Sequence, residues 1–165
     1  MSLIISAATA DDAAAIAALR TAAAESLTRE FGKGHWSSVV FEKGVLRMLD
    51  EPGVFVLKDG AALLATFRLG TRKPWAIDTA YFTNAAKPLY LTEMAVQPDR
   101  QKQGIGRRAV HEASRIAREW PSDAIRLDAY DAPAGAGGFY ARCGYREVGR
   151  VSYRNVPLIY YELVL

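Results

Sequence analysis

The chain has 165 residues, of which half are hydrophobic and 24% are charged, as is typical of one globular domain spanning residues 1–165. A net charge of +3 is too mild for a nucleic-acid-binding tail, although it suits a polyanionic small ligand. The single cysteine, Cys143, excludes an internal disulfide and predicts a reducing compartment. No apolar run reaches membrane-spanning length, and the first residues lack the basic start of a secretory signal, so we expect a cytoplasmic protein without membrane or nucleic-acid partners.

The first third of the chain predicts a short strand followed by two helices. Residues 3–7 are expected to form the strand. Thr9 is a predicted N-cap with Asp12 in the capping-box position, and an Ala-rich helix follows to about Glu25 or beyond. A second helix is expected over residues 39–49.

The next segment predicts a β-hairpin and an aromatic insertion. Asp59 and Gly60 separate the apolar runs 54–57 and 61–69, and Asp-Gly between such runs is a hairpin signal. Residues 72–87 are rich in aromatic side chains but show no clear period. This insertion could line an acceptor pocket or pack over a sheet edge, and the sequence favours neither.

The rest of the chain centres on an apolar strand over 89–96 and an amphipathic helix over 104–119. The elements expected after it are a strand over 124–130, a short helix over 135–142, and strands over 145–153 and 157–164. This order predicts an α/β fold with one central, mixed and mostly antiparallel sheet of six to seven strands and about four helices.

The connection between strand 89–96 and helix 104–119 predicts an anion site. The first turn of a helix has N–H groups without intrahelical partners, and its dipole makes that end positive. Gly104 and Gly106 remove Cβ atoms there, so an anion can approach the bare amides. The cations around the same turn are Arg100, Lys102, Arg107 and Arg108.

Three glycine-rich motifs compete for this turn. No GxxxxGK[ST] string of a P-loop occurs. Residues 104–109 fit the GxGxxA dinucleotide fingerprint, but seven residues separate the strand from its first glycine, which disfavours a nicotinamide dehydrogenase. The third motif, [Q/R]-x-x-G-x-[G/A], is matched by residues 101–106.

Residues 101–106, with Met94-Ala95-Val96-Gln97-Pro98 before them, resemble the acetyl-CoA-binding motif of the GNAT N-acetyltransferase superfamily. Residues 139–145, FYARCGY, are similar to that family's F-Y-x-x-x-G-[FY] segment. The opening strand and Ala-rich helix also resemble the family's start. Three landmarks in the family's order cover most of the chain.

The resemblance implies an N-acetyltransferase that moves an acetyl group from acetyl-CoA to a primary amine of a small molecule or peptide, with no metal. The residues it implies for binding acetyl-CoA are Met94, Ala95, Val96, Gln101, Lys102, Gln103, Gly104, Ile105, Gly106, Arg107 and Phe139. It places carbonyl-polarising main-chain donors near Ala95 and Val96. A homodimer is possible, as in some relatives.

Four side chains are candidates for the chemistry. Tyr140 matches the family's tyrosine and could protonate the leaving thiolate, since a phenol has a pKa of about 10 against about 8.5 for a thiol. Glu93 is the candidate base or amine contact, or else a glutamate paired with an arginine. Asp128 is a second, weaker candidate base. Cys143 could form a covalent acyl-cysteine, but no histidine is tied to it in the sequence, so it is interpreted as a structural thiol.

The acceptor cannot be derived from the sequence. His35 and Trp36 could touch it but are interpreted as a surface histidine and a half-buried tryptophan. Pro133 stands where many relatives carry an asparagine near the pantetheine of CoA, within the small-residue stretch 132–138. The alternative to an enzyme is a non-catalytic acyl-CoA-binding or regulatory module.

Overall fold

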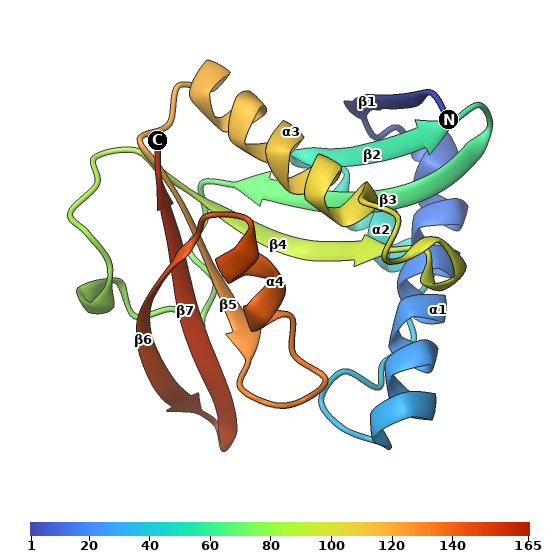
Figure 1. Ribbon diagram of the computed structural model, residues 1–165. Coiled ribbons are helices and arrows are strands. Elements are labelled where there is room, and N and C mark those ends of the chain that lie inside the picture. Colours follow the sequence, from blue (N-terminus) through green and yellow to red (C-terminus); the bar gives the residue numbers. More distant parts are fainter. The chain divides into compact units, whose positions relative to one another are not determined.

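The computed structural model describes all residues from Met1 to Leu165 (Figure 1). The strands are β1 (Leu3–Ala7), β2 (Val54–Asp59), β3 (Ala62–Gly70), β4 (Pro88–Val96), β5 (Ala124–Tyr130), β6 (Arg146–Tyr153) and β7 (Val156–Val164). The α-helices are α1 (Ala13–Phe31), α2 (Glu42–Met48), α3 (Ile105–Glu119) and α4 (Gly137–Arg142).

The strands form one seven-stranded sheet in the order β1-β2-β3-β4-β5-β7-β6. β1 pairs with β2, β2 with β3, β5 with β7 and β6 with β7 in antiparallel fashion, whereas β4 and β5 are parallel. The predicted α/β class, with a mixed and mostly antiparallel sheet and four helices, is confirmed.

Two compact units make up the chain. Unit 1 contains residues 1–68 and 93–112, and unit 2 contains residues 69–92 and 113–165. The expectation of one domain over residues 1–165 stays a prediction.

The core of unit 1 joins α1 and α2 to the hairpin of β2 and β3. Its buried members are Ala13, Ile16, Ala17, Leu19, Val45, Val54, Val56 and Leu63. The predicted capping box is present, because Thr9 N donates to Asp12 Oδ2 at 2.9 Å, and Lys58 Nζ lies 2.5 Å from the other oxygen of Asp12. The Asp12 pKa is lowered, because these hydrogen bonds and the Lys58 charge together outweigh burial, which would raise it.

The second helix is shorter than the pattern predicts. It begins at Glu42 rather than near Val39. The Thr21 hydroxyl donates to Val40 O at 3.2 Å and accepts from Val40 N at 3.0 Å, so a side chain of α1 occupies the groups that an earlier helix start would use.

In unit 2, the aromatic insertion packs on the sheet. Ile77, Phe82, Tyr90 and Tyr160 form one buried cluster, and the Tyr160 hydroxyl bonds to Ala76 O. Of the two interpretations of residues 72–87, this packing supports the one in which the insertion packs over a sheet edge, here over β7 and β6. Trp75 is the exception, because 91% of it is exposed.

Candidate functional site

The turn before α3, in unit 1, has the backbone conformation of an open anion cradle. Lys102 and Gly104 have φ angles of 61° and 82°, so the chain passes twice through the left-handed region in three residues. Residues 101–104 are exposed, whereas Ile105 is buried and anchors the start of the helix. A Cβ built on Gly104 would meet no atom within 4 Å, so the approach to this turn is open.

Main-chain amides and cations border this opening. Arg108 N donates to Gly104 O at 2.9 Å as the first helical bond, and the amides before it have no intrahelical acceptor. The Arg108 guanidinium lies 2.9 Å from Glu112, which orients it along the helix, and Arg107 is exposed. Gln101 Nε2 lies 3.5 Å from Val96 O, which links the turn to the end of β4. The turn could therefore hold an anion, as α3 presents bare amides among positive charges.

The two halves of β4 differ in burial and in strand pairing. Leu89 to Leu91 are buried, but from Thr92 to Val96 no residue is fully buried. β5 pairs with β4 only at Pro88, Leu89 and Tyr90. At its other end, Gln97 N donates to Leu64 O at 2.9 Å.

A kink lies between these two ends, at Glu93. Its φ angle of 57° is left-handed, and no other non-glycine residue inside a strand has such an angle. Its carboxylate forms an ion pair with Arg20 of α1, whose side chain is only 22% exposed. Burial lowers the pKa of Arg20 from its ordinary value. The interpretation of Glu93 as an arginine partner is thus realised in the geometry, although this leaves its catalytic role untested.

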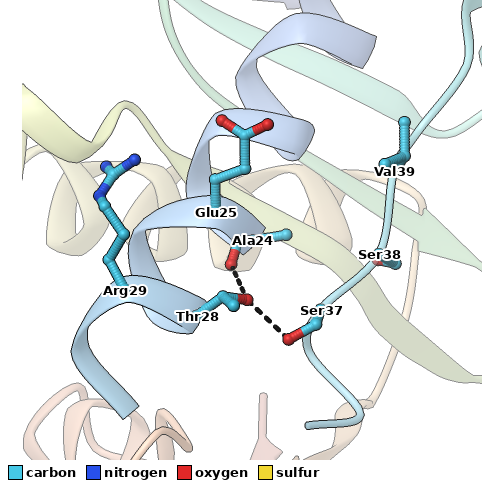
Figure 2. A pocket seen from close by; sticks show the side chains of 7 residues that line it. All are labelled: Ala24, Glu25, Thr28, Arg29, Ser37, Ser38 and Val39. Atoms are coloured by element: carbon cyan, nitrogen blue, oxygen red, sulfur yellow. Dashed lines mark hydrogen bonds between the residues drawn. The ribbon is translucent and has the colours of Figure 1, made fainter. Parts of the chain in front are cut away.

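A groove of about 320 Å³ lies further along α1, between that helix and residues 37–39 (Figure 2). The Ser37 and Thr28 hydroxyls lie 2.6 Å apart, and Thr28 donates to Ala24 O at 2.9 Å, so a hydroxyl chain joins the two walls. Glu25 and Arg29 extend from the helix beside it (Figure 2). The groove begins one helical turn after Arg20, about 6 Å along the helix axis.

His35 and Trp36, the neighbouring candidates, are a surface histidine and a half-buried tryptophan, as the sequence predicts. His35 is exposed, and the Trp36 indole donates to Gly32 O at 3.0 Å. Its ring covers Gly34, where an added Cβ would approach ring carbons to 2.5 Å. Neither residue lines the groove.

Unit 2 holds the predicted proton donor in an aromatic cluster. Tyr140, in α4, is 7% exposed, and its ring lies 5.2 Å from Phe139, 5.7 Å from Tyr145 and 6.3 Å from Tyr161. Burial, then the charges of Cys143 and Asp128, raise the pKa of Tyr140 well above that of a free phenol. At neutral pH this hydroxyl is therefore protonated.

Asp128, in β5, interacts electrostatically with Tyr140 and with two tyrosines outside that cluster. Burial raises the pKa of its carboxyl, and its charge raises the pKa of Tyr130, Tyr140 and Tyr160. A carboxyl with a raised pKa can accept a proton near neutral pH better than an ordinary aspartate can.

The small residues after β5 serve close packing. A Cβ on Gly135 would lie 1.8 Å from Tyr130 O, and one on Gly137 would lie 2.7 Å from the Tyr161 hydroxyl. The bend that carries the chain from β5 into α4, past Pro133, therefore requires glycine at Gly135, whereas a side chain at Gly137 would need the Tyr161 hydroxyl to shift.

Sequence reasoning missed Arg20 and the groove. Glu93, the partner of Arg20, is distant in the chain, and the second wall of the groove belongs to the loop that follows α1, which has no regular pattern. No group of three or more His, Cys, Asp or Glu side chains in the chain is arranged to hold a metal ion. None of the helices is both long and apolar enough to cross a membrane.

Comparison with known proteins gives consistent results. Residues 16–145 match the profile of a family described as the acetyltransferase (GNAT) family. No curated protein sequence matches the chain.

Solved structures with the same fold cover nearly the whole chain. An acetyltransferase of the GNAT family from Listeria monocytogenes has a TM-score of 0.76 at 17% identity, covering 99% of this chain and 95% of that one. The ribosomal-protein-alanine N-acetyltransferase from Brucella melitensis has a TM-score of 0.75 at 18% identity, covering 98% and 99%. The Salmonella typhimurium protein yncA, solved with its cofactor acetyl-CoA, has a TM-score of 0.71 at 18% identity, covering 100% and 95%. Since these identities are low, the structures establish the fold, and the profile match over residues 16–145 establishes that the chain belongs to the acetyltransferase (GNAT) family.

Proposed function

We propose that the protein is an N-acetyltransferase that uses acetyl-CoA as donor and a primary amine of a small molecule or peptide as acceptor. The observation that carries this proposal is the open turn before α3, where Lys102 and Gly104 adopt left-handed angles and expose amides among cations. Family membership and the acetyl-CoA bound to one similar structure support the choice of donor.

In this proposal each group of residues has its own role in binding or catalysis. Residues 101–107 hold the diphosphate of CoA. Met94 to Val96 and Phe139 are the residues assigned to the acyl and pantetheine part. Acetyl-CoA supplies an activated acyl group. Main-chain amides of β4 polarise its carbonyl, and Tyr140 donates a proton to the sulfur as the C–S bond breaks and the C–N bond forms.

We infer that Asp128, rather than Glu93, takes the proton from the attacking ammonium. Burial raises the pKa of Asp128, which brings it closer to the working range of a base at neutral pH. Glu93 is already engaged with Arg20 and is exposed. The groove along α1 is the proposed approach for the acceptor, because its hydroxyls and its flanking charges Glu25 and Arg29 suit a polar amine.

Thiol release from acetyl-CoA tests the proposal directly. The purified protein would be assayed with a panel of amino acids, polyamines, amino sugars and short peptides, and binding of CoA would be measured by calorimetry. Amine-dependent release of thiol supports the enzyme. Tight binding of CoA with no amine-dependent release favours the non-catalytic acyl-CoA-binding module, and absence of CoA binding contradicts both.

Replacing Gly104 by valine should weaken CoA binding. A β-branched residue disfavours the left-handed angle at this position, so the turn must refold and withdraw its amides. We expect the Kd for CoA, measured by calorimetry, to rise at least about tenfold if even one charge-assisted hydrogen bond is lost. Gly60→Val is the matched control, because Gly60 has a φ angle of 59°, open surroundings and a place in the β2–β3 hairpin. Equal Kd values for both variants would contradict the cradle.

Replacing Tyr140 by phenylalanine should lower kcat roughly 100-fold, which is within the usual contribution of a general acid. The ring and its contacts remain, so the Kd for CoA should change less than about twofold, well below the cost of a lost hydrogen bond. Tyr145→Phe, in the neighbouring ring, is the control and should retain turnover. Wild-type kcat in Tyr140→Phe removes this residue from the acid role.

A further inference from the structure

We propose that Arg20 is a positioning residue for the acyl-transfer site, which acts by holding Glu93 in its left-handed conformation. This inference rests on the proposed function, because that function assigns the main-chain groups of β4 after Glu93 to polarising the acyl carbonyl. It assigns no proton transfer to either side chain. The chain of effects runs from the Arg20 guanidinium to the Glu93 carboxylate, then to the Glu93 backbone and the amides that follow.

The first step is the strain at Glu93. A left-handed angle brings Cβ close to the backbone carbonyl, so non-glycine residues other than Asn and Asp seldom adopt it. Lys102, Arg154 and Asn155, the other non-glycine residues with positive φ, lie in turns, where no strand partner constrains them. Glu93 lies within a strand, and such a conformation persists only where the surrounding structure fixes it.

The second step is what fixes it. The Arg20–Glu93 ion pair joins α1 to the kink. The Arg20 side chain is only 22% exposed, so solvent screens its charge less than that of a surface arginine. Without Arg20, no ion pair would favour the present direction of the Glu93 side chain. An extended Glu93 would aim its side chain toward the other face of the strand, because successive side chains of a strand alternate.

The third step is the consequence for the backbone. β4 pairs with β5 only up to Tyr90, and its end is fixed to β3 by the 2.9 Å bond from Gln97 N to Leu64 O. Glu93 is the only residue between these ends with a left-handed φ angle, so its conformation sets the direction in which the peptide groups of Met94 to Val96 point. Those groups include the proposed carbonyl-polarising donors.

Amide exchange tests the backbone effect without turnover. Hydrogen–deuterium exchange of the peptide covering residues 91–97 would be followed in the full chain. Arg20→Met should speed this exchange about tenfold, as expected when a local structure loses a stabilising contact. Arg47→Met, an exposed arginine of α2, is the control and should leave it unchanged. Unchanged exchange in Arg20→Met overturns the proposal.

A double-mutant cycle with Glu93→Gly tests the route of the effect. Glycine adopts a φ angle of 57° without strain, so it should keep the kink without help from Arg20. We expect Arg20→Met alone to lower kcat for thiol release from acetyl-CoA about thirtyfold, with the Kd for CoA changed less than about twofold. In the Glu93→Gly background the same change should cost less than about threefold, as residues acting through one another are non-additive.

Two other results have distinct meanings. Equal losses from Arg20→Met in both backgrounds would show independent action and overturn the proposal. A second contradicting result is a Glu93→Gly variant that loses more activity than Arg20→Met and also loses the acid limb of the pH profile. That result would make Glu93 the base and overturn the proposal. A wild-type protein that binds no CoA contradicts the proposed function instead, and the exchange experiment still decides whether Arg20 holds the kink.

Discussion

Asp128→Asn should abolish most turnover while making the protein more stable. If Asp128 accepts the proton of the attacking ammonium, asparagine removes the acceptor and keeps the shape, so kcat should fall about 100-fold to 10,000-fold. The acid limb of the wild-type pH–rate profile should lie above the ordinary aspartate pKa of 3.8, because burial raises the pKa of Asp128. That limb should be missing from the residual activity of the variant.

The stability effect has the opposite sign, and its pH dependence follows from the same raised pKa. An acid whose pKa is raised in the folded state makes no difference to folding while it is protonated in both states, and it opposes folding once it is ionised. The penalty is absent below the unfolded pKa and grows as the pH rises toward the raised folded pKa. Asp128→Asn should therefore raise Tm at pH 7 and have no such effect near pH 3.

The control for this experiment is Asp131→Asn. Asp131 follows β5, and its carboxylate lies 3.4 Å from the exposed guanidinium of Arg150. This variant should retain the kcat and the pH profile of the wild type. Loss of activity in both variants, or an Asp128→Asn protein with full turnover, would return the role of base to Glu93 or to water.

The parts of the fold that the sequence predicts best depend on local signals. The start of α3 was predicted because Gly104, the polar loop and the helical period of 104–119 all lie within one stretch of chain, whereas anion binding at this turn stays a prediction. The capping box of Thr9 and Asp12 is equally local and is present in the structure. The predicted hairpin also forms, but its turn is Gly60-Ala61 rather than Asp59-Gly60, because Asp59 still pairs with Ala62.

The parts that the sequence did not predict depend on contacts between distant segments. A glutamate has no intrinsic preference for positive φ, so nothing at Glu93 predicts a kink. Its partner Arg20 is, from the sequence, one cation of an Ala-rich helix. The raised pKa of Asp128 arises from burial, which only the assembled sheet creates. The late start of α2 depends on the Thr21 hydroxyl.

The aromatic insertion over residues 72–87 illustrates the same limit in unit 2. Its conformation depends on groups supplied by other strands. Glu162 of β7, which is 2% exposed, accepts hydrogen bonds from Thr83 N at 3.1 Å and from the Thr83 hydroxyl at 2.5 Å. Arg126 of β5 donates to Thr83 O at 2.7 Å, and its guanidinium lies 5.2 Å from the centre of the Phe82 ring. Two buried charges thus fix one loop.

Glu162→Gln should lower the free energy of unfolding more than most single substitutions of this chain. Arg126 Nε lies 3.8 Å from Glu162 Oε2 with both side chains almost fully buried, so the substitution leaves a buried cation without its counter-charge. Removing one partner of such a pair costs about 3 kcal/mol or more of unfolding free energy. For a chain of this size that corresponds to a fall in Tm of roughly 6–12 °C.

A cycle with Arg126→Met identifies the cause. If the loss in Glu162→Gln comes from the unpaired cation, the double variant should be less destabilised than the sum of the two single variants, because no buried charge remains. Glu119→Gln, which disrupts an exposed pair with Arg115 at 2.8 Å, should leave Tm nearly unchanged. Additive losses in urea unfolding would instead mean that the two side chains hold the loop independently, through their separate hydrogen bonds to Thr83.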